Sequence, residues 1–126
     1  MSVRVWKIDR KAVLDRLAQW AQTLGQDKNI LAVVLFGSLA RGDQTAASDA
    51  DVLIILEASS LRFDERIPAM LPLGMGISVD VFPYTLVEAT DALKEGWGVV
   101  PVALQEGLFL FKREERLVEL HGVPKI

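Results

Sequence analysis

Two aspartates one residue apart, Asp49 and Asp51, stand at the head of an apolar run and are the residues whose types and spacing best suit chemistry. On a strand, side chains two apart leave the same face, so these carboxylates would lie close and repel each other. A divalent cation relieves that repulsion, and hard oxygen ligands select Mg²⁺ or Mn²⁺ over zinc. Asp80 lies between two valines on another expected strand, where an unpartnered ionised carboxylate is costly. If strand pairing brings Asp80 beside the pair, the three carboxylates would form a two-metal site, which suits in-line phosphoryl displacement.

A second group of residues could hold a phosphate. Gly37 and Ser38 follow another apolar run. Glycine lets backbone N–H groups approach a phosphate closely, the serine hydroxyl adds a donor, and the turn that follows adds a favourable dipole. Arg41 and Gly42 could extend this cradle. Each of these motifs also has an interpretation without a function. Gly-Ser is common, Asp-x-Asp often caps a turn, and Asp80 could face solvent on an edge strand. Their joint occurrence favours a phosphate-and-metal site.

Four strands are needed to position these residues. The runs at residues 30–36 and 51–56 are apolar on both faces, which predicts two strands buried on both sides. Residues 77–82 alternate and are expected to form a strand closed by Pro83, and residues 108–111 form a short last strand.

Helices are expected between these strands. Residues 9–24 repeat apolar positions at three- and four-residue steps, with Asp9 as N-cap and Gly25 as a left-handed stop. Thr85 and Glu88 form a capping box ahead of a helix at residues 86–94. Further helices are expected at residues 39–42, 63–71, 99–106 and, weakly, 112–119. This order predicts an α/β (α+β) fold with a small mixed sheet of about four strands flanked by helices.

Composition limits the class of protein. The 126 residues fit one domain, residues 1–126. The net charge of −3 argues against a protein that coats nucleic acid, so no direct nucleic-acid binding is expected. There is no cysteine, which excludes disulfides and thiolate metal sites. No apolar run approaches the roughly 20 residues of a membrane helix, so we expect a soluble, cytoplasmic domain without a membrane partner.

The spacing of Gly-Ser, ten residues and Asp-Ala-Asp from position 37 to position 51 resembles the signature of the nucleotidyltransferase superfamily that includes DNA polymerase β. The longer string, Gly-Ser-Leu-Ala-Arg-Gly followed by Ser-Asp-Ala-Asp-Val-Leu-Ile, is similar to the minimal nucleotidyltransferases, the MNT proteins. The helix, glycine and strand expected at residues 103–111 also resemble the ending of MNT proteins. The resemblance covers residues 30–111 and implies the nucleotidyltransferase fold.

The resemblance implies roles for the site residues. Asp49 and Asp51 would bind two Mg²⁺ ions, and Asp80 would bind the catalytic one and help to deprotonate the attacking hydroxyl. Gly37 and Ser38 would hold the β- and γ-phosphates of ATP. A hydroxyl would attack the α-phosphate and pyrophosphate would leave, so the reaction would be nucleotidyl transfer.

The resemblance also implies a partner. MNT proteins typically pair with HEPN ribonucleases in toxin–antitoxin modules, so we expect an antitoxin that transfers AMP to a tyrosine of a HEPN toxin, in a possible hetero-oligomer. The chain ends soon after its expected last strand, which leaves the acceptor to another molecule.

One alternative is neutralisation by binding alone, through the apolar stretches at residues 72–76 and 97–101, which we interpret rather as core. Another is transfer to a small molecule such as an aminoglycoside, which is less favoured because such enzymes hold the drug with a further helical domain.

Overall fold

A computed structural model describes residues 9–45 and 48–117. Four strands form one sheet in the order β3-β2-β1-β4. β1 pairs antiparallel with both β2 and β4, whereas β2 pairs parallel with β3. The strands are β1 (Ile30–Phe36), β2 (Ala50–Leu56), β3 (Val79–Thr85) and β4 (Leu108–Lys112). The predicted mixed sheet is therefore confirmed, with β1 and β2 at its centre.

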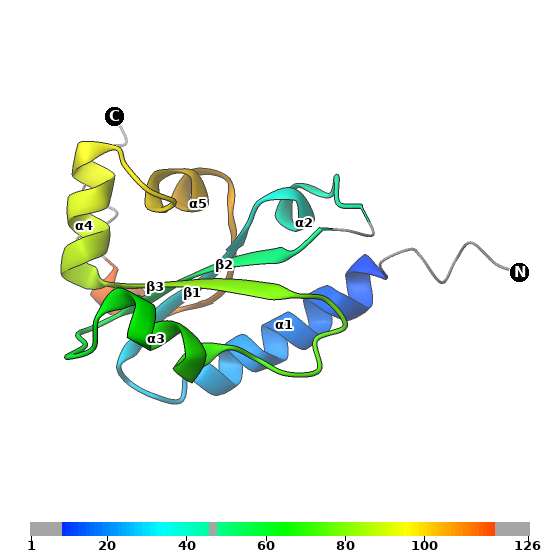
Figure 1. The fold of residues 1–126 in the computed structure, drawn as a ribbon, viewed down its shortest axis with the longest axis horizontal. Helices are drawn as coiled ribbons and strands as arrows, with labels where there is room; N and C mark the ends of the chain where they lie inside the picture. Colours follow the sequence, from blue (N-terminus) through cyan, green and yellow to red (C-terminus); the bar gives the residue numbers. More distant parts are fainter. Residues whose placement is uncertain (1–8, 46–47, 118–126) are drawn as a thin grey trace, which may run out of the picture.

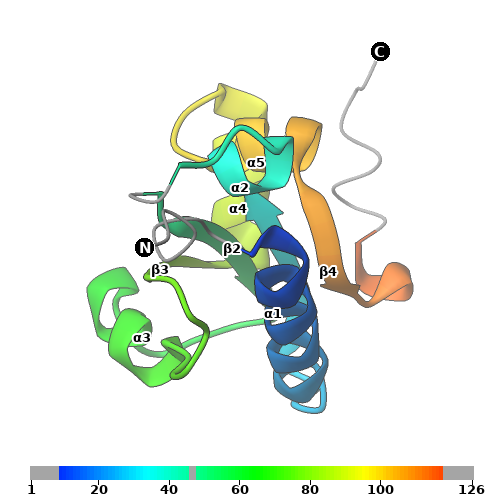
Figure 2. The same cartoon turned by 90° about the vertical axis from the view of Figure 1, so that its right-hand side faces the viewer.

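Helices cover both faces of the sheet. α1 lies on one side, while α4 and α5 lie on the other (Figure 1). β4 forms the edge of the sheet that faces away from β3 and α3 (Figure 2). The helices are α1 (Arg10–Leu24), α2 (Ser38–Arg41), α3 (Phe63–Met70), α4 (Leu86–Glu95) and α5 (Val100–Glu106), followed by a 3₁₀ turn, η2 (Glu114–Arg116). In the part of the chain that the structure describes, no helix has the length and apolar character that crossing a membrane requires.

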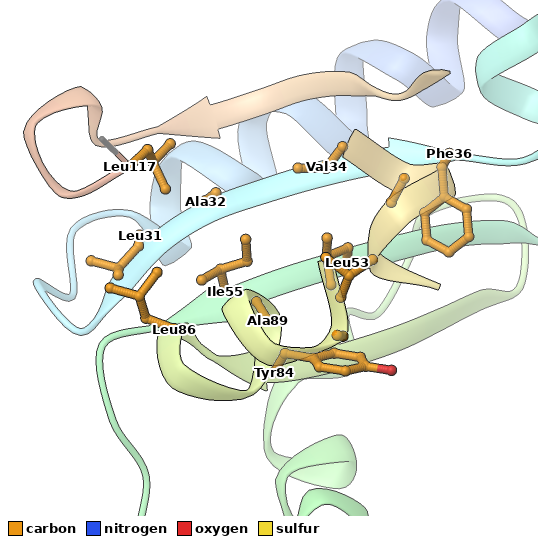
Figure 3. Packing of buried hydrophobic residues seen from close by; sticks show 13 residues of the cluster. Leu31, Ala32, Val34, Phe36, Leu53, Ile55, Tyr84, Leu86, Ala89 and Leu117 are labelled. Atoms are coloured by element: carbon orange, nitrogen blue, oxygen red, sulfur yellow. The ribbon is translucent and has the colours of Figure 1, made fainter. Parts of the chain in front are cut away.

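The two faces of the sheet carry separate apolar clusters. Alternate residues of β1 and β2 point to α1 on one face and to α4 and α5 on the other. In the cluster on the second face, Leu53 and Ile55 of β2 lie with Ala89 of α4 and Tyr84 of β3 (Figure 3). Every residue of β1 is buried, which is why its sequence is apolar without alternation.

The predicted helix ends are largely confirmed. The Asp9 side chain accepts a hydrogen bond from the Ala12 amide at 3.2 Å and so caps α1. The capping box of α4 forms as expected: the Glu88 amide donates to the Thr85 hydroxyl, and the Thr85 amide donates to the Glu88 carboxylate. The expected left-handed stop at Gly25 is wrong, because its φ of −66° is right-handed. Gly25 is needed for space instead, since a Cβ there would meet the Phe111 ring.

Two further predictions are wrong. The strand expected at residues 77–82 and closed by Pro83 instead runs from Val79 to Thr85. β3 is an edge strand, and an edge strand tolerates a residue that has no N–H to donate. The helix expected at residues 112–119 is absent from its described part: β4 includes Lys112 and only the short η2 turn follows, while residues 118 and 119 lie outside the described residues.

The apolar stretches at residues 72–76 and 97–101, interpreted from the sequence as core, are only partly buried. Val100 is fully buried. Trp97, however, is 48% exposed, and Leu73 is 90% exposed in the turn before β3. Both side chains therefore belong to the surface.

Candidate active site

The parallel pairing of β2 with β3 places Asp80 beside Asp51, because the two are register partners. Adjacent strands lie about 4.8 Å apart, and register partners project to the same face of the sheet. Phe36 is the partner of Asp51 on β1 and belongs to the cluster under α4 and α5. The two carboxylates therefore stand at the end of the sheet face that α4 and α5 cover.

Asp49 directly precedes β2 and interacts electrostatically with Asp51. Asp49 and Asp80 are exposed, whereas Asp51 is half-buried. Burial raises the pKa of the Asp51 carboxyl, and the negative charges of Asp80 and then Asp49 raise it further, while the positive charge of Arg41 opposes the rise. Asp51 is thus repelled by both of the other predicted carboxylates.

Gly37 joins the glycine-serine turn to the carboxylates. Its φ of 83° lies in the region that favours glycine. A Cβ at this position would lie 2.5 Å from Oδ2 of Asp51. The backbone of Gly37 therefore packs directly against the Asp51 carboxylate, and any side chain would push the two apart.

Ser38 opens α2 and ties it to the segment ahead of β2. Its hydroxyl donates to the Ser48 hydroxyl at 3.1 Å. The Ser48 hydroxyl also accepts from the Thr45 amide at 2.8 Å. Ser48 was not predicted as a site residue, although its position immediately before Asp49 was a local signal. This small network links the turn to the residue that precedes Asp49.

Arg41 lies at the end of α2 between two acidic side chains. Its guanidinium is 3.2 Å from Asp43 and 3.3 Å from Glu106, which is the last residue of α5. The guanidinium is 46% exposed, so an anionic ligand could approach it. No local sequence pattern indicates that Glu106 contacts Arg41, because the two residues are 65 positions apart in the chain.

Gly42 ends α2 with a left-handed φ of 88°. Its amide donates to the Ser38 carbonyl at 2.9 Å, so that N–H is already used within the turn. The structure therefore gives Gly42 a part in shaping the turn, and phosphate binding by Gly42 stays a prediction.

The donor set suits a hard divalent cation. The three carboxylates stand at the start of β2 and β3, and the repulsion on Asp51 is what such a cation would relieve. Over residues 9–45 and 48–117, no group of three or more His, Cys, Asp or Glu side chains is already arranged to hold a metal ion. The residue types thus fit the cation, and coordination of the cation by all three carboxylates stays a prediction.

Comparisons with known proteins agree with this geometry. The model of the nucleotidyltransferase domain family matches residues 14–121. A crystal structure from Sulfolobus solfataricus, of a protein provisionally described as a nucleotidyltransferase, superposes with a TM-score of 0.56 at 20% sequence identity. The match covers 84% of this chain and 86% of that one, and at this identity it shows a shared fold. Among curated protein sequences, none matches the chain.

Proposed function

The chain belongs to the nucleotidyltransferase domain family, and we propose that it transfers AMP from ATP to a tyrosine hydroxyl of a partner protein. The partner in this proposal is a HEPN-type ribonuclease toxin, which the transfer neutralises. The observation that carries the proposal is the placement of Asp80 beside Asp51, with the backbone of Gly37 against the Asp51 carboxylate. The acceptor class rests on the resemblance of the sequence to MNT proteins.

The nucleotide is held by the turn between β1 and β2. The Ser38 hydroxyl and the Gly37 backbone bind the β- and γ-phosphates, and Arg41 supplies a positive charge beside them. Ser38 must exchange its bond to Ser48 for one to the phosphate. Because Gly37 contacts Asp51, a triphosphate bound at this turn lies beside the carboxylates. In the proposed reaction, its α-phosphate is the one that faces them.

Asp49, Asp51 and Asp80 would hold Mg²⁺, which supplies positive charge to offset the charge that develops on the transferred phosphate. Asp80 accepts the proton of the acceptor hydroxyl as the oxygen attacks the α-phosphorus. The bond between the α-phosphorus and the bridging oxygen breaks, and pyrophosphate leaves. Asp80 is exposed on an edge strand, so a tyrosine of another protein can reach it.

Incubation with α-labelled ATP, Mg²⁺ and the product of the neighbouring gene tests the proposal. We expect label on a tyrosine of that protein, and none after Asp49→Ala or Asp51→Ala. The matched control is Asp91→Asn, which removes an exposed carboxylate of α4 away from the site. Absence of label on the partner with the wild-type chain would contradict the proposal.

A second candidate function is neutralisation by binding alone. It is favoured by the exposed apolar side chains of Leu73 and Trp97, which a partner could cover. Asp51→Asn separates the two functions in cells that express the toxin. Full protection by this variant would support binding alone, and loss of protection would support transfer.

A further inference from the structure

We propose that Arg10 is a positioning residue for nucleotide binding, because it holds α2 from the neighbouring helix α1. The side chain of Arg10 leaves the first residue of α1 and reaches two carbonyls of α2. The link from this contact to catalysis rests on the proposed function, whereas the contact itself does not.

The geometry is that of a cap on a one-turn helix. Arg10 Nε donates to the Leu39 carbonyl at 3.0 Å, and its Nη2 donates to the Ala40 carbonyl at 3.2 Å. Carbonyls at the end of a helix have no partner within the helix, and a cation there also complements the helix dipole.

Two other carbonyls of the turn are satisfied internally. The Gly37 carbonyl accepts from the Arg41 amide, and the Ser38 carbonyl accepts from the amides of Gly42 and Asp43. Arg10 therefore adds a partner for each of two further carbonyls, those of Leu39 and Ala40, from a single guanidinium. The ammonium of a lysine is a point charge and would not reproduce this planar fork.

The contact matters because α2 is short and its position sets the site. Within the described part of the chain, its other side-chain bonds are Ser38 to Ser48, and Arg41 to Asp43 and Glu106. An incoming triphosphate would compete for these, since it would bind Ser38 and Arg41 themselves. Arg10 and the buried side chain of Leu39 would then hold α2 in place.

A small rotation of α2 would change the position of Gly37 relative to the Asp51 carboxylate. Gly37 precedes α2 and packs so closely on Asp51 that a Cβ would lie 2.5 Å from Oδ2. Loss of Arg10 would let the turn move away from that carboxylate, and the phosphates with it. We expect weaker nucleotide binding with little change in the rate of the chemical step once nucleotide is bound.

Hydrogen exchange tests the contact without reference to activity. Arg10→Ala should speed exchange of the amides of Arg41, Gly42 and Asp43 by about tenfold, while amides of β1 keep their wild-type rates. The matched control is Arg16→Ala, which removes another arginine of α1 that donates to a backbone carbonyl, that of Met75 at 3.1 Å. Unchanged exchange in α2 after Arg10→Ala, or an equal increase after Arg16→Ala, would overturn the proposal.

Nucleotide binding tests the consequence. The dissociation constant of a non-transferable ATP analogue with Mg²⁺ should rise about tenfold in Arg10→Ala, less in Arg10→Lys, and not in Arg16→Ala. Free guanidinium at millimolar concentration should restore part of the loss in Arg10→Ala only. An unchanged dissociation constant in Arg10→Ala would overturn the positioning role. If the wild-type chain bound no analogue, the proposed function would fail, while exchange would still decide whether Arg10 holds α2.

Discussion

Two carboxylates, Asp51 of β2 and Glu88 of α4, lie in opposite electrostatic surroundings. Glu88 is paired with Arg66 by two bonds of 2.7 and 3.0 Å and also accepts from the Thr85 amide. Its bonds to Arg66 hold the pKa of Glu88 below its ordinary value. Asp51 forms no ion pair with any described Lys or Arg, and burial together with Asp80 and Asp49 raises its pKa.

This difference separates a structural carboxylate from a functional one. The charge of Glu88 is satisfied within the chain and joins α3 to α4. The charge of Asp51 is opposed within the chain, and that arrangement costs stability until something positive arrives. Perturbed carboxylates of this second kind cluster at functional sites.

The largest effect is expected from Asp51→Asn. Nucleotidyl transfer should fall by about a thousandfold or more, because the carboxylate charge that would hold the cation is lost. The melting temperature without metal should rise at pH 7, since the substitution removes the repulsion with Asp80 and Asp49. Thermal unfolding measures the change in melting temperature, and a transfer assay measures the loss of activity. The control Asp91→Asn should change neither. A less stable Asp51→Asn variant would contradict the contrast with Glu88.

Glu88→Ala should act in the opposite sense. Arg66 is only 5% exposed, and without Glu88 its remaining bonds to described residues are those to the Leu61 and Pro83 carbonyls. We expect a loss of about 2 kcal/mol in the free energy of unfolding, below the value for a fully buried pair because Glu88 is 41% exposed.

A matched control for Glu88→Ala is Glu57→Ala. Glu57 also forms two bonds to an arginine, Arg116, each 2.8 Å long, but both side chains of that pair are more than 40% exposed. Its loss should be much smaller, because water screens the pair. Equal losses in denaturant titrations would show that burial of Arg66 is not what matters.

The stability that Glu88 contributes should depend on pH. The folded-state pKa of Glu88 is lowered, so its contribution is fully present above the unfolded pKa of about 4.3 and is lost as pH falls through the folded value. The difference in unfolding free energy between wild type and Glu88→Gln should therefore shrink as pH falls below about 4.3. A difference that stayed constant from pH 7 to pH 3 would contradict this.

The smallest effect is expected from Glu106→Gln. Glu106 competes with an incoming phosphate for Arg41, which lies 3.3 Å away and is half-exposed. Removing its charge should tighten ATP binding by less than about fivefold, as expected for a solvent-exposed pair. Weaker binding of a Mg²⁺–ATP analogue in calorimetry would show instead that Glu106 helps to orient Arg41.

Much of the fold could be predicted because its signals are local. β1 was predicted to the residue, since its seven residues form an unbroken apolar run. The capping box at Thr85 and Glu88 also needs only neighbours in sequence. The continuation of β3 through Pro83 could not be predicted, because it depends on the place of β3 at the sheet edge.

The site divides in the same way. The types and spacing of Gly37, Asp49 and Asp51 stand in one stretch of sequence, and the parallel pairing then brings Asp80 to Asp51. Arg10 and Glu106 carried no signal, because their contacts with α2 join residues 29 to 65 positions apart. Such contacts depend on packing, which no local pattern records.

Calorimetric titration of a non-transferable ATP analogue, with and without Mg²⁺, tests directly whether these carboxylates serve metal-dependent nucleotide binding. Wild type should bind the analogue at least about tenfold more tightly with Mg²⁺, and Asp51→Asn should lose this dependence. Equal binding with and without Mg²⁺ in wild type, or an unchanged Mg²⁺ dependence in Asp51→Asn, would contradict it.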